Sequence, residues 1–390
     1  MRRVKPFRRL WARASGWLDY LQYGRHLRQY QKLAEDRGLG NVCEADIWQQ
    51  VRARLQGRGE KRWPRAQGDL HIFLAYYLSN WESVLPQAFS TFGPVSTFEW
   101  RSRGFNDEGA EWPDKRDDMN RAMLAEFRRV SEREPIDVVI GYLSGHNTSA
   151  ETVFQMAQNG AAVLNFCWDD KLRFPGRKVG GRFPSPAGIA HAVDLNVTNA
   201  PDSVAKYLVH GGLAVFAPEA AHPAIHRPFD LAFEYDITFI GNANGWRPFF
   251  MEELKHAGLG VECFGCGWPN GVLDDDDLVK MVSRSRINLG LGFNGNVRRL
   301  LSLKGRDFEV PMCGGLYLTQ DNPELRLVYD VGQEIVTFSK PLDCARVAHE
   351  LLEDPTRAEA IRRAGRRRAL TEHTYEARWG RILRRAGLLQ

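Results

Sequence analysis

Several features that define common classes of protein are absent from this chain of 390 residues. It has no run of 18 or more apolar residues, so we expect no membrane-spanning helix. Its six cysteines are too few, in so long a chain, for the disulfide framework of a small secreted protein. Its basic beginning also lacks the continuous apolar segment of a signal peptide. We therefore expect a cytoplasmic protein.

Signals for nucleic-acid binding are missing as well. There is no zinc-finger spacing and no aromatic RNA-binding motif, and the formal net charge is only +5. Residues 1–30 hold eight Lys and Arg against one Asp, and residues 361–386 hold nine Arg against two Glu, so the rest of the chain is acidic. A nucleic-acid binder needs a basic stripe along its folded surface. Nucleic acid is therefore not an expected partner.

The pattern of residues 1–30 predicts a basic helix in which apolar residues recur at roughly helical spacing. These positions are Phe7, Leu10, Trp11, Leu18 and Leu21. Such a helix suits peripheral contact with the anionic inner surface of a membrane. The alternative is a helix that packs on the protein and leaves its arginines in water, and the sequence leaves both open.

The hydrophobic content of 43% in a chain of this length predicts two domains with sizeable cores. Apolar runs typical of buried parallel strands alternate with helical patterns, which predicts an α/β fold of two Rossmann-like domains. The strands are predicted at 69–78, 95–100, 136–143, 161–168, 191–199 and 213–217, then at 235–242, 260–265, 286–293, 316–319 and 334–338.

The Pro-, Ala- and His-rich segment 217–230 lacks both patterns and is predicted to be a linker. The remaining parts are a basic helical extension (1–68), a first domain (69–216), a second domain (231–370) and a C-terminal helix (371–390). Since no G-x-G-x-x-G fingerprint occurs in either domain, we expect the site in a cleft between them.

The densest group of chemically active residues lies in residues 304–315. Lys304 and Arg306 precede an expected helix start, where unpaired N–H groups also favour an anion. A compact ammonium and a forked guanidinium together suit a diphosphate. Glu309 could accept hydrogen bonds from paired sugar hydroxyls, and Gly314–Gly315 allow close backbone approach. A helix start with charged residues and a glycine stop is the structural alternative.

Several segments, in order and with their spacing, resemble GT-B fold glycosyltransferases of the CgeB (spore maturation protein) type over about residues 233–386. The segments are YDITFIGN (235–242), Arg247, FGCGWP (264–269), SRSRINL (283–289), KGRDFEVPMCGG (304–315), Leu318-Thr319 and EHTY (372–375). The resemblance implies two Rossmann-like domains with parallel sheets facing an interdomain cleft, and a C-terminal helix that crosses back to the first domain. It also implies a nucleotide-sugar donor as substrate, without a further cofactor.

The resemblance assigns the donor site residue by residue. Glu309 is implied to hold the ribose, Lys304 and Arg306 the diphosphate, and Arg247 the phosphates. For Trp268, a place beside the nucleobase and a place in the core are both open. Leu301 stands eight positions before Glu309, where the retaining relatives carry Glu, so retention and inversion stay open. The predicted donor-binding residues are Gly241, Asn242, Arg247, Gly265, Trp268, Lys304, Arg306, Glu309, Gly314 and Gly315.

An inverting enzyme also needs a base near the acceptor hydroxyl. Asp169, Asp170 and His146 follow predicted strands of the first domain, where ligands of open sheets bind, and are the candidates. Capping of loops is their structural alternative. No metal is expected, because the cations can supply the positive charge and the acidic run Asp274–Asp277 suits a helix start better than a metal.

Three functions remain open at this point. The first is a glycosyltransferase that acts on a saccharide, protein or lipid-linked acceptor. The second is a GT-B epimerase, which would interconvert free sugar nucleotides without an acceptor. The third is a non-catalytic assembly or binding protein that keeps the fold. Lys304, Arg306 and Glu309 together favour an enzyme over the non-catalytic protein.

Overall fold

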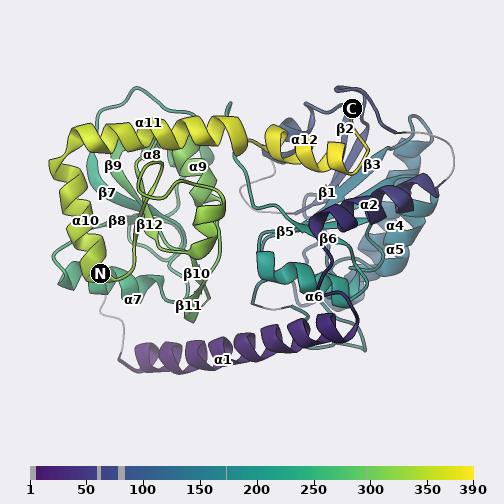
Figure 1. Ribbon diagram of the computed structural model, residues 1–390, viewed down its shortest axis with the longest axis horizontal. Coiled ribbons are helices and arrows are strands. Elements are labelled where there is room, and N and C mark those ends of the chain that lie inside the picture. The colour runs from purple at the N-terminus through teal and green to yellow at the C-terminus, as the bar shows by residue number, and fades with distance from the viewer. Residues whose placement is uncertain (1–5, 59–62, 78–83, 173, 296) are drawn as a thin grey trace. The chain divides into compact units, whose positions relative to one another are not determined.

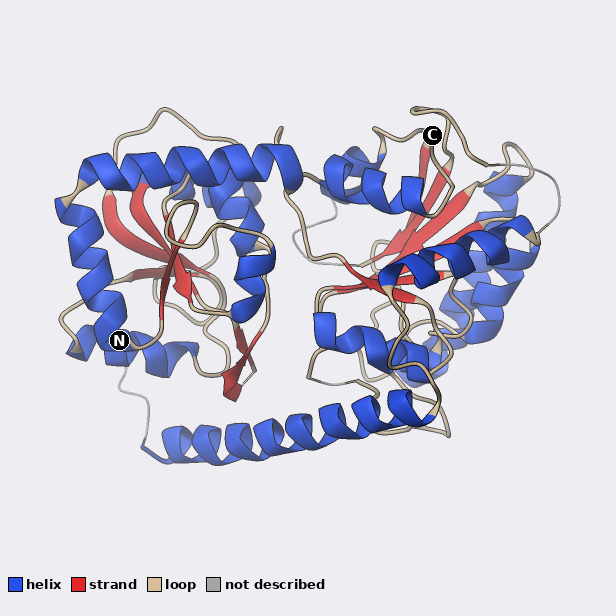
Figure 2. Cartoon of the chain, viewed as in Figure 1, coloured by secondary structure: helices blue, strands red, loops and turns tan. Residues whose placement is uncertain are grey.

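The computed structural model describes the backbone of residues 6–58, 63–77, 84–172, 174–295 and 297–390, and side chains from residue 14 onward. The chain divides into two compact units (Figure 1). Unit 1 contains residues 1–24 and 219–377, and unit 2 contains residues 25–218 and 378–390. Each unit is a parallel sheet flanked by helices (Figure 2), as the sequence predicts.

Unit 2 is built on a six-stranded sheet with the order β2-β1-β3-β4-β5-β6. All its neighbouring strands are parallel, and Ile72 of β1 lies opposite Val95 of β2 and Val138 of β3. The four central strands are wholly buried, because helices on both sides leave their apolar runs no face toward solvent. The strands are β1 (Ile72–Tyr76), β2 (Val95–Glu99), β3 (Val138–Gly141), β4 (Ala162–Cys167), β5 (Leu195–Thr198) and β6 (Ala214–Phe216).

The helices of unit 2 follow from apolar spacing and capping. In α4, Met119, Met123 and Phe127 recur every four residues and are buried. The start of α5 is fixed by Ser149, whose Oγ accepts from the backbone N–H of Thr152 over 3.0 Å. Helix α2 lies in the extension 1–68, which was predicted to be helical without bounds for this helix. The helices are α1 (Pro6–Asp36), which begins in unit 1, α2 (Glu44–Gln56), α3 (Val84–Phe89), α4 (Trp112–Ser131), α5 (Ala150–Gln158) and α6 (Val204–Val209), with 3-10 turns at Pro186–Gly188 and Pro201–Ser203.

Unit 1 has a five-stranded parallel sheet with the order β13-β12-β9-β7-β8, and its strands were all predicted. A separate antiparallel pair, β10 with β11, was not predicted, because β10 has only two residues and β11 (VRRLL) carries two arginines in place of a continuous apolar run. The strands are β7 (Tyr235–Ile240), β8 (Glu262–Phe264), β9 (Ser285–Gly290), β10 (Phe293–Asn294), β11 (Val297–Leu301), β12 (Tyr317–Gln320) and β13 (Val336–Phe338).

Helices α7 and α10 pack together in unit 1, as do α9 and α11. Asp274 caps α8 by accepting from the N–H of Asp277 over 2.8 Å, which confirms the capping role predicted for this acidic run. The helices are α7 (Arg247–His256), α8 (Asp275–Arg284), α9 (Arg306–Met312), α10 (Pro341–Glu353), α11 (Pro355–Glu372) and α12 (Tyr375–Arg385), which ends in unit 2, with a 3-10 turn at Pro323–Leu327.

The units divide between Pro218 and Glu219, inside the segment 217–230 predicted as a linker. At the end of the chain Trp379 belongs to unit 2, where its ring lies 5.1 Å from that of Phe89 and 5.8 Å from that of Phe166. None of the helices in the described part of the chain is long and apolar enough to cross a membrane. For the predicted basic helix, the side chains of Phe7, Leu10 and Trp11 lie outside the described residues.

Candidate functional site

The strand order of unit 1 reverses between β7 and β9, because the chain adds β8 on one side of β7 and the later strands on the other. Open parallel sheets bind ligands outside the carboxyl ends of strands at such a reversal. Ile240 ends β7 and is followed by Gly241 and Asn242, two residues of the predicted donor site. The topology therefore points to the same edge of the sheet as the sequence does.

The loops that follow β7 and β8 are bonded to each other. The N–H of Gly241 donates to the carbonyl oxygen of Phe264 over 2.8 Å, and the N–H of Cys266 donates to Asn242 Oδ1 over 3.0 Å. Gly265 has a φ of +129°, and a Cβ at this position would lie 2.7 Å from the carbonyl carbon of Gly241. A glycine at position 265 is thus what allows the two backbones to approach.

Trp268 supports these loops from inside the core. Its side chain is 8% exposed, its ring lies edge-on to that of Phe239 at 6.3 Å, and its indole N–H donates to the carbonyl oxygen of Gly241 over 2.7 Å. Of the two places left open by the sequence, the geometry favours the core. Trp268 therefore fixes the position of Gly241 from within the core.

Two arginines from different helices meet beside this loop. Arg306 Nη1 donates to the carbonyl oxygen of Ile240 over 2.6 Å, and Arg247 Nη1 donates to that of Asn242 over 3.0 Å. Both guanidinium groups lie over the ring of Phe239, at 5.2 Å and 5.6 Å from its centroid respectively. A Cβ at Gly241 would clash with Arg306 Nη1, so the glycine makes room for one of the two cations.

This pair concentrates positive charge in a shielded place. Burial, followed by the nearby charge of Arg306, lowers the pKa of the Arg247 guanidinium to about 9. Within the described residues neither arginine forms a salt bridge, and both are held by backbone oxygens instead. Two like charges without a bonded acid are stabilised by an anion that touches both.

The beginning of α9 is held by Asp307, whose role the sequence did not reveal. Its carboxylate accepts from the N–H of Lys304 over 2.7 Å and from the hydroxyl of Tyr317 over 2.6 Å. Burial raises the pKa of Asp307 to about 6, against the hydrogen bonds and the charges of Arg306 and Lys304. Asp307 therefore positions the segment that carries the two predicted diphosphate contacts.

Glu309 lies on α9 with two further residues around it. Its Oε1 is 4.0 Å from Nε2 of His226, and its side chain is 21% exposed. A Cβ placed on Gly305 would lie 3.0 Å from this oxygen and 2.8 Å from Oε2 of Glu219. Glu219 and His226 come from the predicted linker, where no pattern indicated them, so the sequence missed this cluster.

Gly314 and Gly315 lie at the opposite end of α9. Their N–H groups donate to the carbonyl oxygens of Pro311 and Val310, both over 2.9 Å, which ends the helix. A Cβ on Gly315 would lie 2.6 Å from Cγ1 of Val282. The structure thus brings the other predicted donor residues to the carboxyl end of β7 and the start of α9, whereas this pair ends α9, with Gly314 half-buried and Gly315 buried.

The three candidate bases lie in unit 2 and differ in accessibility. Asp169 is exposed and accepts from the hydroxyl of Tyr142 over 3.2 Å. Asp170 is 2% exposed, and its two oxygens accept from Thr198 over 2.9 Å and from Tyr207 over 2.8 Å. Burial raises the pKa of Asp170 to about 6. These contacts suit Asp170 to holding strand ends together rather than to meeting an acceptor.

His146 is exposed at the end of the loop that follows β3. Its Nε2 lies 2.8 Å from the carbonyl oxygen of Asp107, and its own carbonyl oxygen accepts from the indole of Trp112 over 3.0 Å. The ring is therefore already engaged by the protein. Across the described part of the chain, no three His, Cys, Asp or Glu side chains gather in an arrangement that could hold a metal ion.

Comparison with known proteins places this geometry in context. Residues 247–384, which include both site arginines, match the sequence profile of a family described as glycosyl transferase-like. This match lies within the segment 233–386 for which the resemblance was noted. No curated protein matches the chain in sequence.

Solved structures share the fold at low sequence identity. The HepE protein of Anabaena, in complex with UDP and glucose, is 9% identical with a TM-score of 0.53, over 81% of this chain and 98% of its own. Sucrose-phosphate synthase of Thermosynechococcus elongatus is 11% identical with a TM-score of 0.58, over 81% and 98%. A glycosyltransferase of Rickettsia africae is 8% identical with a TM-score of 0.55, over 82% and 98%. The chain thus has the GT-B fold with two Rossmann-like parts, as predicted.

Proposed function

We propose that this protein is a glycosyltransferase that moves a sugar from a uridine-diphosphate sugar to an acceptor. The observation that carries the proposal is the pairing of Arg247 and Arg306 over Phe239 at the carboxyl end of β7. Two forked guanidinium groups suit the adjacent phosphates of a nucleoside diphosphate. The profile match over residues 247–384 supports the reaction class, and the UDP complex of HepE supports the choice of uridine.

The chemistry needs positive charge at the leaving group. The bond between the anomeric carbon and the β-phosphate oxygen breaks, and its electron pair stays on that oxygen. The acceptor hydroxyl forms the new bond and gives up its proton. Arg247 and Arg306, fixed by backbone oxygens, would stabilise the charge that develops on the phosphate. We propose that these cations act without a metal, so transfer should persist in EDTA. Loss of transfer in EDTA would overturn this part.

The remaining donor contacts are proposed from the resemblance and from position. Glu309 would accept hydrogen bonds from the ribose hydroxyls, and Lys304 would contact the diphosphate from the start of α9. The partial exposure of Glu309 is compatible with this role. Asp169 is our proposed base for an inverting reaction, because it is the exposed member of the aspartate pair. From the resemblance we also propose that the enzyme is of the CgeB type. Its acceptor is proposed to be a saccharide, a protein or a lipid-linked molecule.

The decisive experiment is calorimetric titration of the full chain with UDP. Removing a charged hydrogen-bond donor in Arg306→Gln should weaken UDP binding about 10- to 100-fold. Arg346→Gln is the matched control, because Arg346 is an exposed arginine of unit 1 bonded to Asp343 and Glu350. Its loss should leave UDP affinity within about twofold, as expected for a surface ion pair.

Three outcomes would overturn the proposal in different directions. Absence of UDP binding in the unaltered chain would favour an assembly protein, as would UDP binding that Arg306→Gln leaves unchanged. Conversion of a free UDP-sugar into a second free UDP-sugar, without any acceptor, would show an epimerase. Release of UDP that depends on an added acceptor, with the sugar found on that acceptor, would support transfer.

We also propose a place of action in the cytoplasm at the inner membrane surface. Helix α1 carries Trp17, Leu18 and Leu21 with exposed fractions of 60%, 60% and 48%, in a segment rich in arginine. Apolar side chains beside basic ones favour anionic lipid surfaces. Leu18→Asn with Leu21→Asn should reduce sedimentation with phosphatidylserine vesicles, whereas Leu342→Asn, at another exposed leucine, should not. Equal sedimentation of all three proteins would contradict membrane contact.

A further inference from the structure

A second concave site lies wholly within unit 2. It is a cavity of about 670 Å³ beside the starts of α4 and α5, and its wall includes the segment 178–183. Its volume lies in the range of small-molecule sites, about 300–1,000 Å³. The loop that follows β3 forms part of its lining through Gly145, Thr148 and Ser149. The cavity is thus at the carboxyl end of a central strand, where open sheets bind ligands.

Positive charge dominates the lining of this pocket. Arg116, Lys178 and Arg182 line it together with His191 and His210. Burial lowers the pKa of Arg116, against the neighbouring charge of Asp117, and the charge of Arg182 lowers it further. Burial lowers the pKa of His210 as well, with contributions from Arg37 outside the pocket and then from His191 and Lys178. Cationic groups on separate segments are therefore close enough to repel one another, a strain that an anion would relieve.

The described part of the lining also holds two acids, of which Asp117 is paired with a cation and Glu151 with a neutral amide. Asp117 lies 3.2 Å from the guanidinium of Arg116, and Glu151 accepts from Gln155 over 2.9 Å. Within the described residues, Lys178 and Arg182 take part in no salt bridge, and Lys178 lies 4.8 Å from the ring centroid of Phe183. Their charges are therefore available to a ligand.

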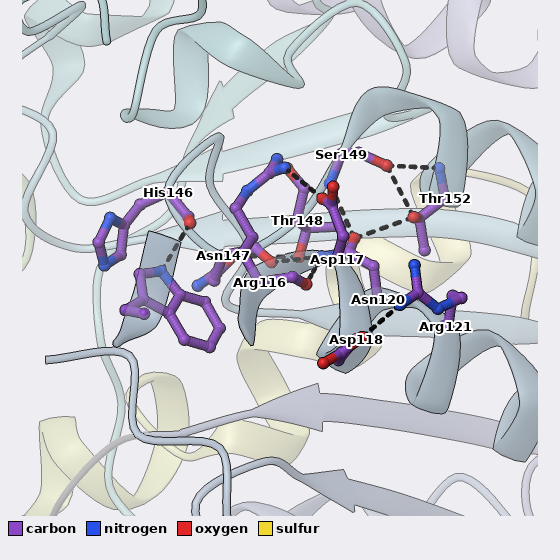
Figure 3. A network of polar contacts seen from close by, with 11 residues as sticks. Arg116, Asp117, Asp118, Asn120, Arg121, His146, Asn147, Thr148, Ser149 and Thr152 are labelled. Carbon is purple, nitrogen blue, oxygen red and sulfur yellow. Dashed lines mark hydrogen bonds and ion pairs between the residues drawn. The ribbon is translucent and has the colours of Figure 1, made fainter. Parts of the chain in front are cut away.

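The wall that carries Arg116 is held by a buried polar network (Figure 3). Asn120 accepts from the N–H of Ser149 and the hydroxyl of Thr152, both over 2.9 Å, and donates to the carbonyl oxygens of Arg116 and Asn147 over 2.7 Å and 2.8 Å. This one amide ties the start of α4 to the start of α5. Because all its hydrogen-bonding groups are used, it fixes the pocket wall before a ligand arrives.

A second connection runs through Arg116 itself. Its Nη2 donates to the carbonyl oxygen of Thr148 over 2.8 Å, so the guanidinium is held against the loop that lines the cavity (Figure 3). Its Nε is buried and has no hydrogen-bond partner among the described residues. A guanidinium held in this way keeps its charge at a fixed place in the lining of the cavity.

The other cations sit on a tight hairpin. Val179 and Arg182 exchange two backbone hydrogen bonds of 2.9 Å and 3.0 Å. Between them, Gly180 and Gly181 have φ of +54° and +79°, as a two-residue hairpin turn requires. Lys178 and Arg182 flank this short turn and both line the cavity. The hairpin therefore presents two cations to one pocket.

We propose that this pocket binds a small ligand of sugar size through a phosphate or carboxylate group. Arg116 would grip the oxyanion from the rigid wall, and Lys178 and Arg182 would close on it from the hairpin. That this ligand is the acceptor, and hence that the acceptor is anionic, rests on the proposed function. The binding of an oxyanion at this pocket does not rest on it, because its residues are separate from the nucleotide site.

The test is calorimetric titration with three probes of equal ring size: glucose 6-phosphate, glucuronate and glucose. The full chain is first saturated with UDP, and the titrations are repeated with Arg306→Gln, so that phosphate binding at the nucleotide site does not contribute. The phosphate or the carboxylate sugar should bind, and neutral glucose should bind at least tenfold more weakly. The anion that binds more tightly shows whether the pocket prefers a phosphate or a carboxylate group.

The paired change Lys178→Gln with Arg182→Gln should weaken anion binding at least tenfold. Both side chains are exposed, so the fold should survive, and a circular dichroism melt checks this. Arg177→Gln is the matched control, since Arg177 is an exposed neighbour that does not line the pocket. Failure of both anions to bind while UDP binds would overturn this inference alone, as would equal weakening in the control. UDP failure with intact anion binding would overturn only the proposed function.

Discussion

The indole N–H of Trp268 donates to the carbonyl oxygen of Gly241 across 2.7 Å. Trp268 follows strand β8 and Gly241 follows the neighbouring strand β7, so the bond holds the loop after β8 against the loop after β7. Gly241 in turn borders Arg306, because a side chain on it would meet that guanidinium. A core tryptophan thus helps to place a cation of the proposed donor site.

Removing only this hydrogen bond tests that connection. Trp268→Phe keeps an aromatic ring but leaves the Gly241 oxygen without its donor, which should lower the free energy of unfolding by about 1–3 kcal/mol. UDP affinity should fall several-fold because the loop relaxes. Urea unfolding and calorimetry measure the two effects. Trp17→Phe, at an exposed tryptophan, should change neither. A lower free energy of unfolding with unaltered UDP affinity would show that Trp268 stabilises the core without affecting the donor site.

Gly241→Ala tests the space that Arg306 needs. The added Cβ would clash with the guanidinium, and the φ of +150° disfavours any side chain. We expect UDP binding to fall at least tenfold. Gly258→Ala separates backbone strain from the clash, because Gly258 also has a positive φ, +84°, but no atom within 4 Å of the added Cβ. This control should lower Tm slightly and leave UDP affinity unchanged. If Gly241→Ala and Gly258→Ala lowered UDP affinity equally, a clash with Arg306 could not be the cause.

The strands were predictable because parallel strands buried on both faces read as continuous apolar runs. The run IDVVIGYL (136–143) contains β3, and YDITFIGN (235–242) contains β7. Gly241 and Asn242 directly follow β7, so their place at this edge of the sheet was predictable for the same reason. The topology brings them to one edge, and a local pattern already marks that edge.

Residues that act across the chain were not predictable. Glu219 and His226 approach Glu309 from a segment without helix or strand pattern, and nothing local to positions 219 and 226 indicates a site. Gly314 and Gly315 adjoin a charged motif in sequence, but in space they lie at the far end of the helix that it begins. Sequence proximity stands for spatial proximity only within about one helical turn.

Arg247 should contribute to binding at the expense of stability. Its pKa is lowered by burial and by Arg306, so its charge is unfavourable in the free protein. Arg247→Gln removes that repulsion, and we expect a Tm equal to or above that of the unaltered protein. UDP affinity should nevertheless fall at least tenfold, because a phosphate contact is lost. Scanning calorimetry with and without UDP measures both, and a large fall in Tm of the free protein would show a structural role instead.

We expect Asp169 to serve catalysis and Asp170 to serve stability. If Asp169 is the base, Asp169→Asn should lower transfer about 100-fold or more, as general-base removal does, without changing Tm. Asp170→Asn should instead alter stability, because both its carboxylate oxygens accept hydrogen bonds in the core. Transfer rates at saturating UDP-sugar, measured beside thermal melts, distinguish the two. Full activity of Asp169→Asn would remove it as the base.

The pH dependence of stability gives a signature for Asp170. Its pKa rises from 3.8 to about 6 on burial, so between these values the folded carboxyl keeps a proton that the unfolded one has lost. Stability contributed by this group therefore falls as pH rises through that window, by up to about 3 kcal/mol, and is constant above it. Relative to Asp170→Asn, the unaltered protein should lose stability from pH 4 to 6.5 in urea titrations. Tyr207→Phe removes a hydrogen bond that lowers this pKa, so the loss should extend to higher pH. Parallel curves for all three proteins would show that Asp170 is ionised throughout.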